Sequence, residues 1–122
     1  MMRWLSVGAG IALGIGCAGA PPVPAQRFSD ADTDIKAAQE MGAANNSQGK
    51  VHLQQARDNL AAAEKLNKDE PAVAARKLDN ADAEAALAKQ VTHEQAARAE
   101  ADQAKAKLNA VQQSLPGTGG GQ

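Results

Sequence analysis

Residues 71–90, PAVAARKLDNADAEAALAKQ, decide the fold of this chain. Small and apolar side chains recur there at alternating steps of four and three residues, which places them on one face of an α-helix. Pro71 fits the first helical turn, where a missing N–H costs nothing, and Asp69 or Glu70 can cap the start. The expected packing stripe is Ala74, Leu78, Ala81, Ala85 and Ala88.

Similar composition upstream predicts two further helices. The first starts at Ser29, a good N-cap, and the second runs from Ser47 to Asn67 after the turn signal Asn45–Ser47. No alternating β-branched run occurs, so the sequence offers no support for a strand. The expected stripes are Ala31, Ile35, Ala38 and Gly42 in the first helix, and Leu53, Ala56, Leu60, Ala63 and Leu66 in the second.

The third helix is predicted to be much longer than the second. At 1.5 Å per residue, Glu70 to Leu115 spans about 69 Å and Ser47 to Asn67 about 31 Å. The fold class is therefore all-α: an antiparallel helical hairpin or three-helix bundle with one long C-terminal helix. The Ala-rich helical domain covers residues 29–115, and the Gly-rich residues 116–122 are expected to be disordered.

The first 16 residues have the pattern of an export signal. Arg3 precedes an uncharged apolar run, Trp4 to Gly16. A helix needs roughly 18 to 20 apolar residues to span a bilayer, and this run is shorter. Its four glycines also weaken it as a permanent helix. Residues 1–16 are therefore predicted to be a signal peptide.

Cys17 is the only cysteine in the chain. Small residues before it resemble the lipobox of bacterial lipoproteins, although Gly14 stands where Leu is usual. Cleavage before Cys17 with acylation of the thiol is the leading interpretation, because a lone exposed thiol is a liability in an oxidising compartment. The alternatives are ordinary cleavage after Ala25, and an uncleaved or cytosolic form.

Acylation of Cys17 would define a membrane anchor. Two or more acyl chains hold a protein stably in a bilayer. By analogy, Ala18 in place of Asp points to the outer membrane, on the side that faces the periplasm. Residues 17–28 then form the lipidated cysteine and a Pro-rich tether. The ten residues 18–27 reach roughly 30 Å if extended, at about 3.1 Å each.

The third helix extends beyond the second from about Val91, and this part has no predicted partner in the chain. Its apolar spacing resumes in a set that we name the C-terminal seam. We expect the seam to pair with another copy or with an envelope protein. The alternative is an exposed, frayed helix, or one broken near Thr92. The C-terminal seam consists of Ala101, Ala104, Leu108, Val111 and Leu115.

Residues 30–106 resemble a family of exported bacterial helical domains, domain-of-unknown-function family 4398. The resemblance rests on Gly42-Ala43, on the Leu53, Ala56, Leu60 and Ala63 spacing, and on the alanines that follow at steps of three and four. Members often have a proline before the second helix, where this chain has Asn45-Asn46-Ser47. The resemblance implies an envelope lipoprotein with a helical hairpin or short bundle, and it transfers no catalytic residue.

The remaining side chains do not point to catalysis, a cofactor or a metal. His52 and His93 are the only histidines, belong to no metal-ligand motif, and are expected to be solvent-exposed on helices. Without Arg3, 12 of the 13 basic residues remain beside 14 acidic ones, interspersed along the chain. No basic patch with interleaved aromatics exists, so nucleic-acid binding is not supported.

The sequence therefore predicts a lipid-anchored periplasmic protein of the cell envelope that acts as a structural spacer, scaffold or adaptor and is not an enzyme. A binding module for peptidoglycan or a small envelope ligand is the alternative. Phe28 is the one aromatic residue left after Trp4 is removed with the signal, which weakens direct recognition of sugar rings.

Overall fold

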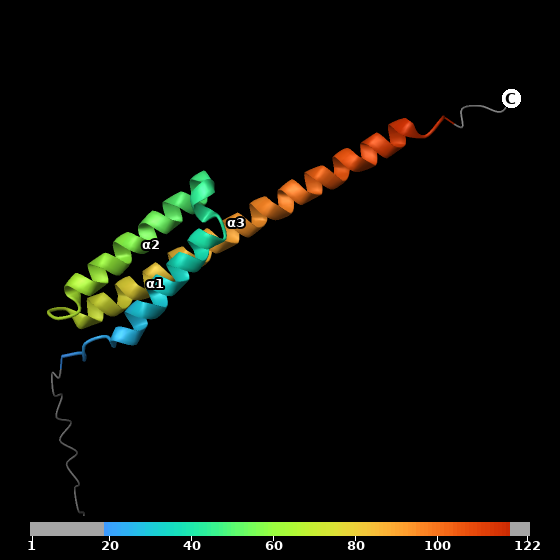
Figure 1. Cartoon of the computed structure of the whole chain (residues 1–122). Helices are drawn as coiled ribbons and strands as arrows, with labels where there is room; N and C mark the ends of the chain where they lie inside the picture. Colours follow the sequence, from blue (N-terminus) through green and yellow to red (C-terminus); the bar gives the residue numbers. More distant parts are fainter. Residues whose placement is uncertain (1–18, 118–122) are drawn as a thin grey trace, which may run out of the picture.

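The computed structural model describes residues 19–117, and this part of the chain is helical without strands (Figure 1). It contains α1 (Ala25–Glu40), the short 3-10 helix η1 (Ala43–Asn45), α2 (Ser47–Leu66) and α3 (Pro71–Ser114). The all-α prediction with one long C-terminal helix is confirmed, and the architecture is the three-helix bundle. The predicted signal peptide, Cys17 and most of the Gly-rich tail lie outside the described residues.

Polar contacts between helices define their directions. Arg27 of α1 contacts Asp79 of α3, and Asp34 farther along α1 contacts Lys89 farther along α3, so these two helices run parallel. His52 near the start of α2 contacts Glu84 of α3, and the α2–α3 connection is only four residues long, so α2 runs antiparallel to α3. The first half of α3 therefore lies against both shorter helices (Figure 1).

The first helix begins at Ala25, four residues before the predicted start, so the assignment of Ser29 as its N-cap is wrong. The cause is a tertiary contact. The side chain of Asn67, just after α2, accepts a hydrogen bond from the Val23 N–H at 2.6 Å and donates one to the Val23 carbonyl at 3.0 Å. This pair holds extended Pro24 in place at the helix start. Residues from Val23 onward thus belong to the bundle rather than to a tether.

The turn between α1 and α2 depends on two glycines. Gly42 was predicted to lie in the stripe of the first helix, but it follows the end of α1 with a φ of 93°, a left-handed conformation that favours glycine. Asn46 caps α2, because its side chain accepts a hydrogen bond from the Gly49 N–H. Gly49 itself is buried where η1 crosses α2. A Cβ there would lie 2.5 Å from the Ala43 carbonyl oxygen.

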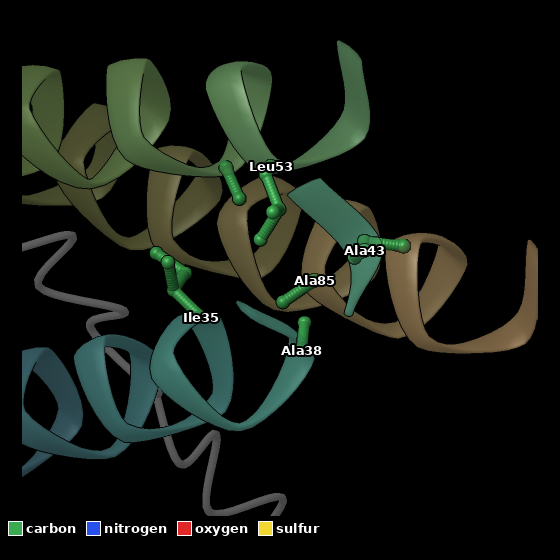
Figure 2. Close-up of a cluster of buried hydrophobic side chains, with 7 residues drawn as sticks. Ile35, Ala38, Ala43, Leu53 and Ala85 are labelled. Atoms are coloured by element: carbon green, nitrogen blue, oxygen red, sulfur yellow. The ribbon is translucent and has the colours of Figure 1, made fainter. Parts of the chain in front are cut away.

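The core is made mainly of alanine. Among the described residues, only three buried side chains are larger, namely Ile35, Leu53 and Leu78. Figure 2 shows the cluster that contains Ile35 and Leu53. Leu60 and Leu66, which were predicted as stripe residues of the second helix, are only partly buried at its edge. Alanine ends at Cβ, so it lets helix backbones approach closely while burying little area. The buried alanines are Ala31, Ala38, Ala43, Ala56, Ala63, Ala74, Ala81, Ala85 and Ala88.

Leu78→Ala is expected to destabilise the fold strongly, because Leu78 has no exposed surface and is the largest buried side chain of one of the two core clusters. Truncation of a buried leucine costs about 2–5 kcal/mol. Leu108→Ala, the same change on the exposed part of α3, should stay within about 0.5 kcal/mol. Urea unfolding followed by circular dichroism measures both. Equal effects of the two substitutions would contradict the assigned core.

Gly49→Ala tests the close approach of η1 to α2. Helix propensity alone would favour alanine by about 1 kcal/mol. A Cβ at position 49 would lie only 2.5 Å from the Ala43 carbonyl oxygen, so we expect the opposite effect, a lower free energy of unfolding. Gln48→Ala, at the exposed neighbouring position, serves as the control and should change little. A Gly49→Ala protein with a raised melting temperature would show that the two elements are not in close contact.

Candidate interaction surface

The two shorter helices cover only the first half of α3. Buried side chains on α3 end at Ala88, Val91 and Thr92 are partly buried, and every side chain from His93 to Gly117 is exposed. The part of α3 formed by residues 93–114, which we name the overhang, is about 33 Å long and projects beyond the bundle (Figure 1). The prediction that this part lacks a partner within the chain holds for the described residues.

The helix passes the end of the bundle without a break, so the alternative of an interruption near Thr92 is wrong. Thr92 Oγ1 donates to the Ala88 carbonyl at 2.8 Å, which keeps its polar group within the helix. Its oxygen also accepts a hydrogen bond from Asn46 Nδ2 at 3.3 Å. The residue that caps α2 therefore also contacts α3 at the last point where the two helices meet.

The C-terminal seam lies on the overhang and is solvent-exposed throughout. Leu108 is 57% exposed, Val111 55% and Leu115 63%, and Ala101 and Ala104 are exposed as well. Leu115 caps the helix end rather than lying within it. The seam is thus the largest concentration of exposed aliphatic side chains among the described residues, and the bundle does not cover it.

The seam does not continue the buried stripe of α3. Ala81, the middle of that stripe, and Leu108, the middle of the seam, are 27 positions apart, or about seven and a half turns at 3.6 residues per turn. The half turn places the two sets on opposite sides of the helix. The seam therefore faces away from the side on which α1 and α2 pack. Spacing is regular within each set, and the change of face becomes evident only from the 27-residue interval between them.

Charged side chains at the edges of the bundle join α1 and α2 to α3. Arg27 donates to Asp79 at 2.9 Å and to Asp82 at 3.3 Å, and Lys89 donates to Asp34 at 2.8 Å. The hydrogen bond to Asp79 raises the pKa of Arg27, while burial raises the pKa of Asp82 against the opposing effect of Arg27. These pairs orient the helices, and exposed pairs of this kind add little stability.

The prediction that both histidines are solvent-exposed is wrong for His52 and right for His93. His52 Nδ1 lies 2.7 Å from Glu84 Oε2, and about a quarter of each side chain is exposed. The contact is long-range and links α2 with α3, so it depends on the antiparallel pairing that no local motif encodes. Between residues 19 and 117, no cluster of three or more His, Cys, Asp or Glu side chains could hold a metal ion.

Hollows on the bundle surface are shallow and of mixed character. A groove of about 220 Å³ between α1 and α2 is lined by apolar and charged side chains, among them Ile35, Leu60, Arg57 and Glu64. Arg57 donates to Gln39 Oε1 at 2.6 Å across this groove. The lining combines opposite charges with a small apolar base, and it presents no nucleophile with a neighbouring base. The exposed face of the overhang is therefore the stronger candidate for an interaction surface.

No helix within residues 19–117 combines the length and the apolar character that crossing a membrane requires.

No family model, curated protein or solved structure matches this chain. The resemblance to domain-of-unknown-function family 4398 accordingly stays a prediction.

A chain ending at Glu94 is expected to unfold with the same denaturant midpoint as the full chain, because no side chain beyond Thr92 is buried against the bundle. Its circular-dichroism signal at 222 nm should be smaller, because about 20 helical residues are removed. Chemical unfolding monitored by circular dichroism reports both quantities. A clearly lower midpoint would show that the overhang packs against the bundle after all. Thr92→Val in the full chain is the control, because it removes the hydroxyl that accepts the hydrogen bond from Asn46 where α3 leaves the bundle.

Proposed function

We propose that this chain is a lipid-anchored helical protein of the bacterial cell envelope that faces the periplasm and presents a bare helix at a distance from the membrane. In this role it is a spacer and adaptor rather than an enzyme. The observation that carries the proposal is that the N-terminal segment and the overhang lie at opposite ends of the bundle. The chain enters the bundle beside Asn67, at the end opposite the overhang (Figure 1).

The geometry of the N-terminal segment supports an anchor close to the bundle. Val23 is fixed by Asn67, so only six positions separate Cys17 from the folded part. Six fully extended residues span at most roughly 20 Å. α3 runs for 44 residues, or about 66 Å. Reach from the membrane therefore comes from the stiff helix, and the segment after Cys17 contributes less than the 30 Å expected of a longer tether.

The same segment bears on where the signal is cleaved. Cleavage after Ala25 would remove Val23 and Pro24, together with both hydrogen bonds to Asn67. It would also leave the core cluster around Leu78 without the packing of Val23. Cleavage before Cys17 keeps every one of these contacts. Retention of the complete bundle thus favours cleavage before Cys17 over the alternative site.

The exposed surface of the overhang supports the adaptor role. A monomeric helix of 22 residues with Leu108, Val111 and Leu115 largely exposed gains nothing from these side chains unless they are covered. An envelope protein or a second copy can cover them. The bundle then serves as the rigid base that carries the helix, and its shallow grooves need no ligand.

Intact-mass spectrometry of the membrane fraction tests this proposal. The wild-type chain is expected to begin at Cys17 and to carry acyl chains, which hold it in the membrane. Cys17→Ala removes the acceptor thiol, so this variant should lose the lipid mass and the mature, membrane-held form. Cys17→Ser, which also lacks the thiol but keeps a polar side chain of similar size, is the matched control and should behave like Cys17→Ala. A native product that starts at Gln26, without lipid and in the soluble extract, would overturn the proposal.

A further inference from the structure

The outer face of α3 has a regular apolar pattern that extends beyond the C-terminal seam. Leu87 lies 21 positions before Leu108, about six turns, so both side chains are on the same side of α3. Leu87 is 41% exposed although it belongs to the part of α3 within the bundle. Steps of three and four connect the two leucines. This outer stripe consists of Leu87, Gln90, Glu94, Ala97, Ala101, Ala104, Leu108, Val111 and Leu115.

The outer stripe has the heptad spacing of a two-stranded coiled coil. It lies opposite the face that α1 and α2 cover, so a second helix can lie along it without meeting the bundle of its own chain. The stripe starts on the bundle at Leu87 and continues to Leu115, and α3 is unbroken from Leu87 to Ser114, the residue before Leu115. A partner helix would therefore have a contact line of about 42 Å.

We propose that the outer stripe is the contact surface for a second copy of this chain, with the two α3 helices parallel and in register. The charges beside the stripe carry this choice. Glu100 and Lys105 flank it on opposite sides, five positions apart. In a parallel pair, Glu100 of each copy then faces Lys105 of the other, which gives two attractive contacts. Both side chains are exposed, and neither forms an ion pair within residues 19–117.

An antiparallel pair is disfavoured by the same residues. In the antiparallel register that places Leu87 level with Val111 of the second copy, Arg98 is level with Glu100, but these two residues lie on different flanks of the stripe. The nearest charge on the same flank is Arg98 for Arg98 and Glu100 for Glu100, each two residues away along the axis. Like charges in these positions oppose pairing. The parallel arrangement avoids both repulsions, and its one unfavourable layer is Glu94 opposite Glu94.

The parallel orientation rests in part on the proposed function. Two copies anchored through Cys17 in one membrane project their α3 helices in the same direction, as a parallel pair requires. Anchoring also raises the effective concentration of one copy around the other, which favours a contact that is weak in solution. A thin stripe with three alanines and one glutamate fits such a weak contact, because alanine buries little area.

Cross-linking of the full chain through one introduced cysteine tests the pairing. Ala97→Cys and Ala104→Cys place a thiol on the outer stripe, whereas Ala99→Cys and Ala106→Cys place it on the opposite side two residues later. All four positions are exposed on the same helix. After mild copper-catalysed oxidation, the two stripe variants are expected to give several-fold more disulfide-linked dimer on a non-reducing gel than the two controls. Leu108→Asp added to Ala104→Cys should reduce the dimer to the control level.

Equal cross-linking of stripe and control variants would overturn the pairing. Cross-linking at only one of Ala97→Cys and Ala104→Cys would overturn the parallel register, because an antiparallel pair brings at most one of these positions next to its own copy. The native Cys17 is common to all four variants and contributes equally. Separation of the membrane fraction from the soluble extract reports on anchoring independently. A chain found in the soluble extract counts against the proposed function, while the cross-linking pattern still decides the pairing.

Discussion

Ala56 and Ala63 of α2 and Ala81, Ala85 and Ala88 of α3 have no exposed surface, and the rest of the molecule depends on their packing. Because these side chains end at Cβ, α2 and α3 can lie close together, with backbone and Cβ atoms making most of the contact. Such an interface tolerates no larger residue without moving a helix. Within residues 19–117 it also leaves only Ile35, Leu53 and Leu78 as larger buried side chains, so stability is concentrated in a few positions.

The contacts that orient α1 are of a different kind. Arg27 and Asp34 reach charged partners on α3 at the edge of the bundle, while Asn67 holds Val23 by two hydrogen bonds before the helix begins. Exposed ion pairs contribute little free energy, but they are directional, and together they set which way α1 runs. The parallel course of α1 and α3 brings the chain into the bundle at the end far from the overhang. That placement is what the proposed spacer role depends on.

One long helix thus serves two separate surfaces. The inner face of α3 completes the bundle as far as Thr92, and its outer face carries exposed aliphatic side chains from Leu87 to Leu115. If the exposed aliphatic side chains lay on the same face as the buried stripe, α1 and α2 would block a partner helix where the bundle begins. The shift to the opposite face leaves α3 from Leu87 onward open to a partner helix. Because the helix is stiff, the position of the bundle also determines where the exposed outer face of α3 lies.

The sequence by itself determined the helical class, the approximate extent of α2 and α3, the alanine stripes and the excess length of the last helix, because these follow from local propensity and from spacing along one helix. It missed the start of α1 at Ala25, the partnership of His52 with Glu84 and the burial of Gly49, since each depends on a residue far away or on a different element. Helical spacing did predict the covered side of α3, because the expected stripe from Ala74 to Ala88 is the buried one. The choice between a hairpin and a three-helix bundle came from the tertiary structure, because the contacts that place α1 against α3 join residues far apart in the sequence.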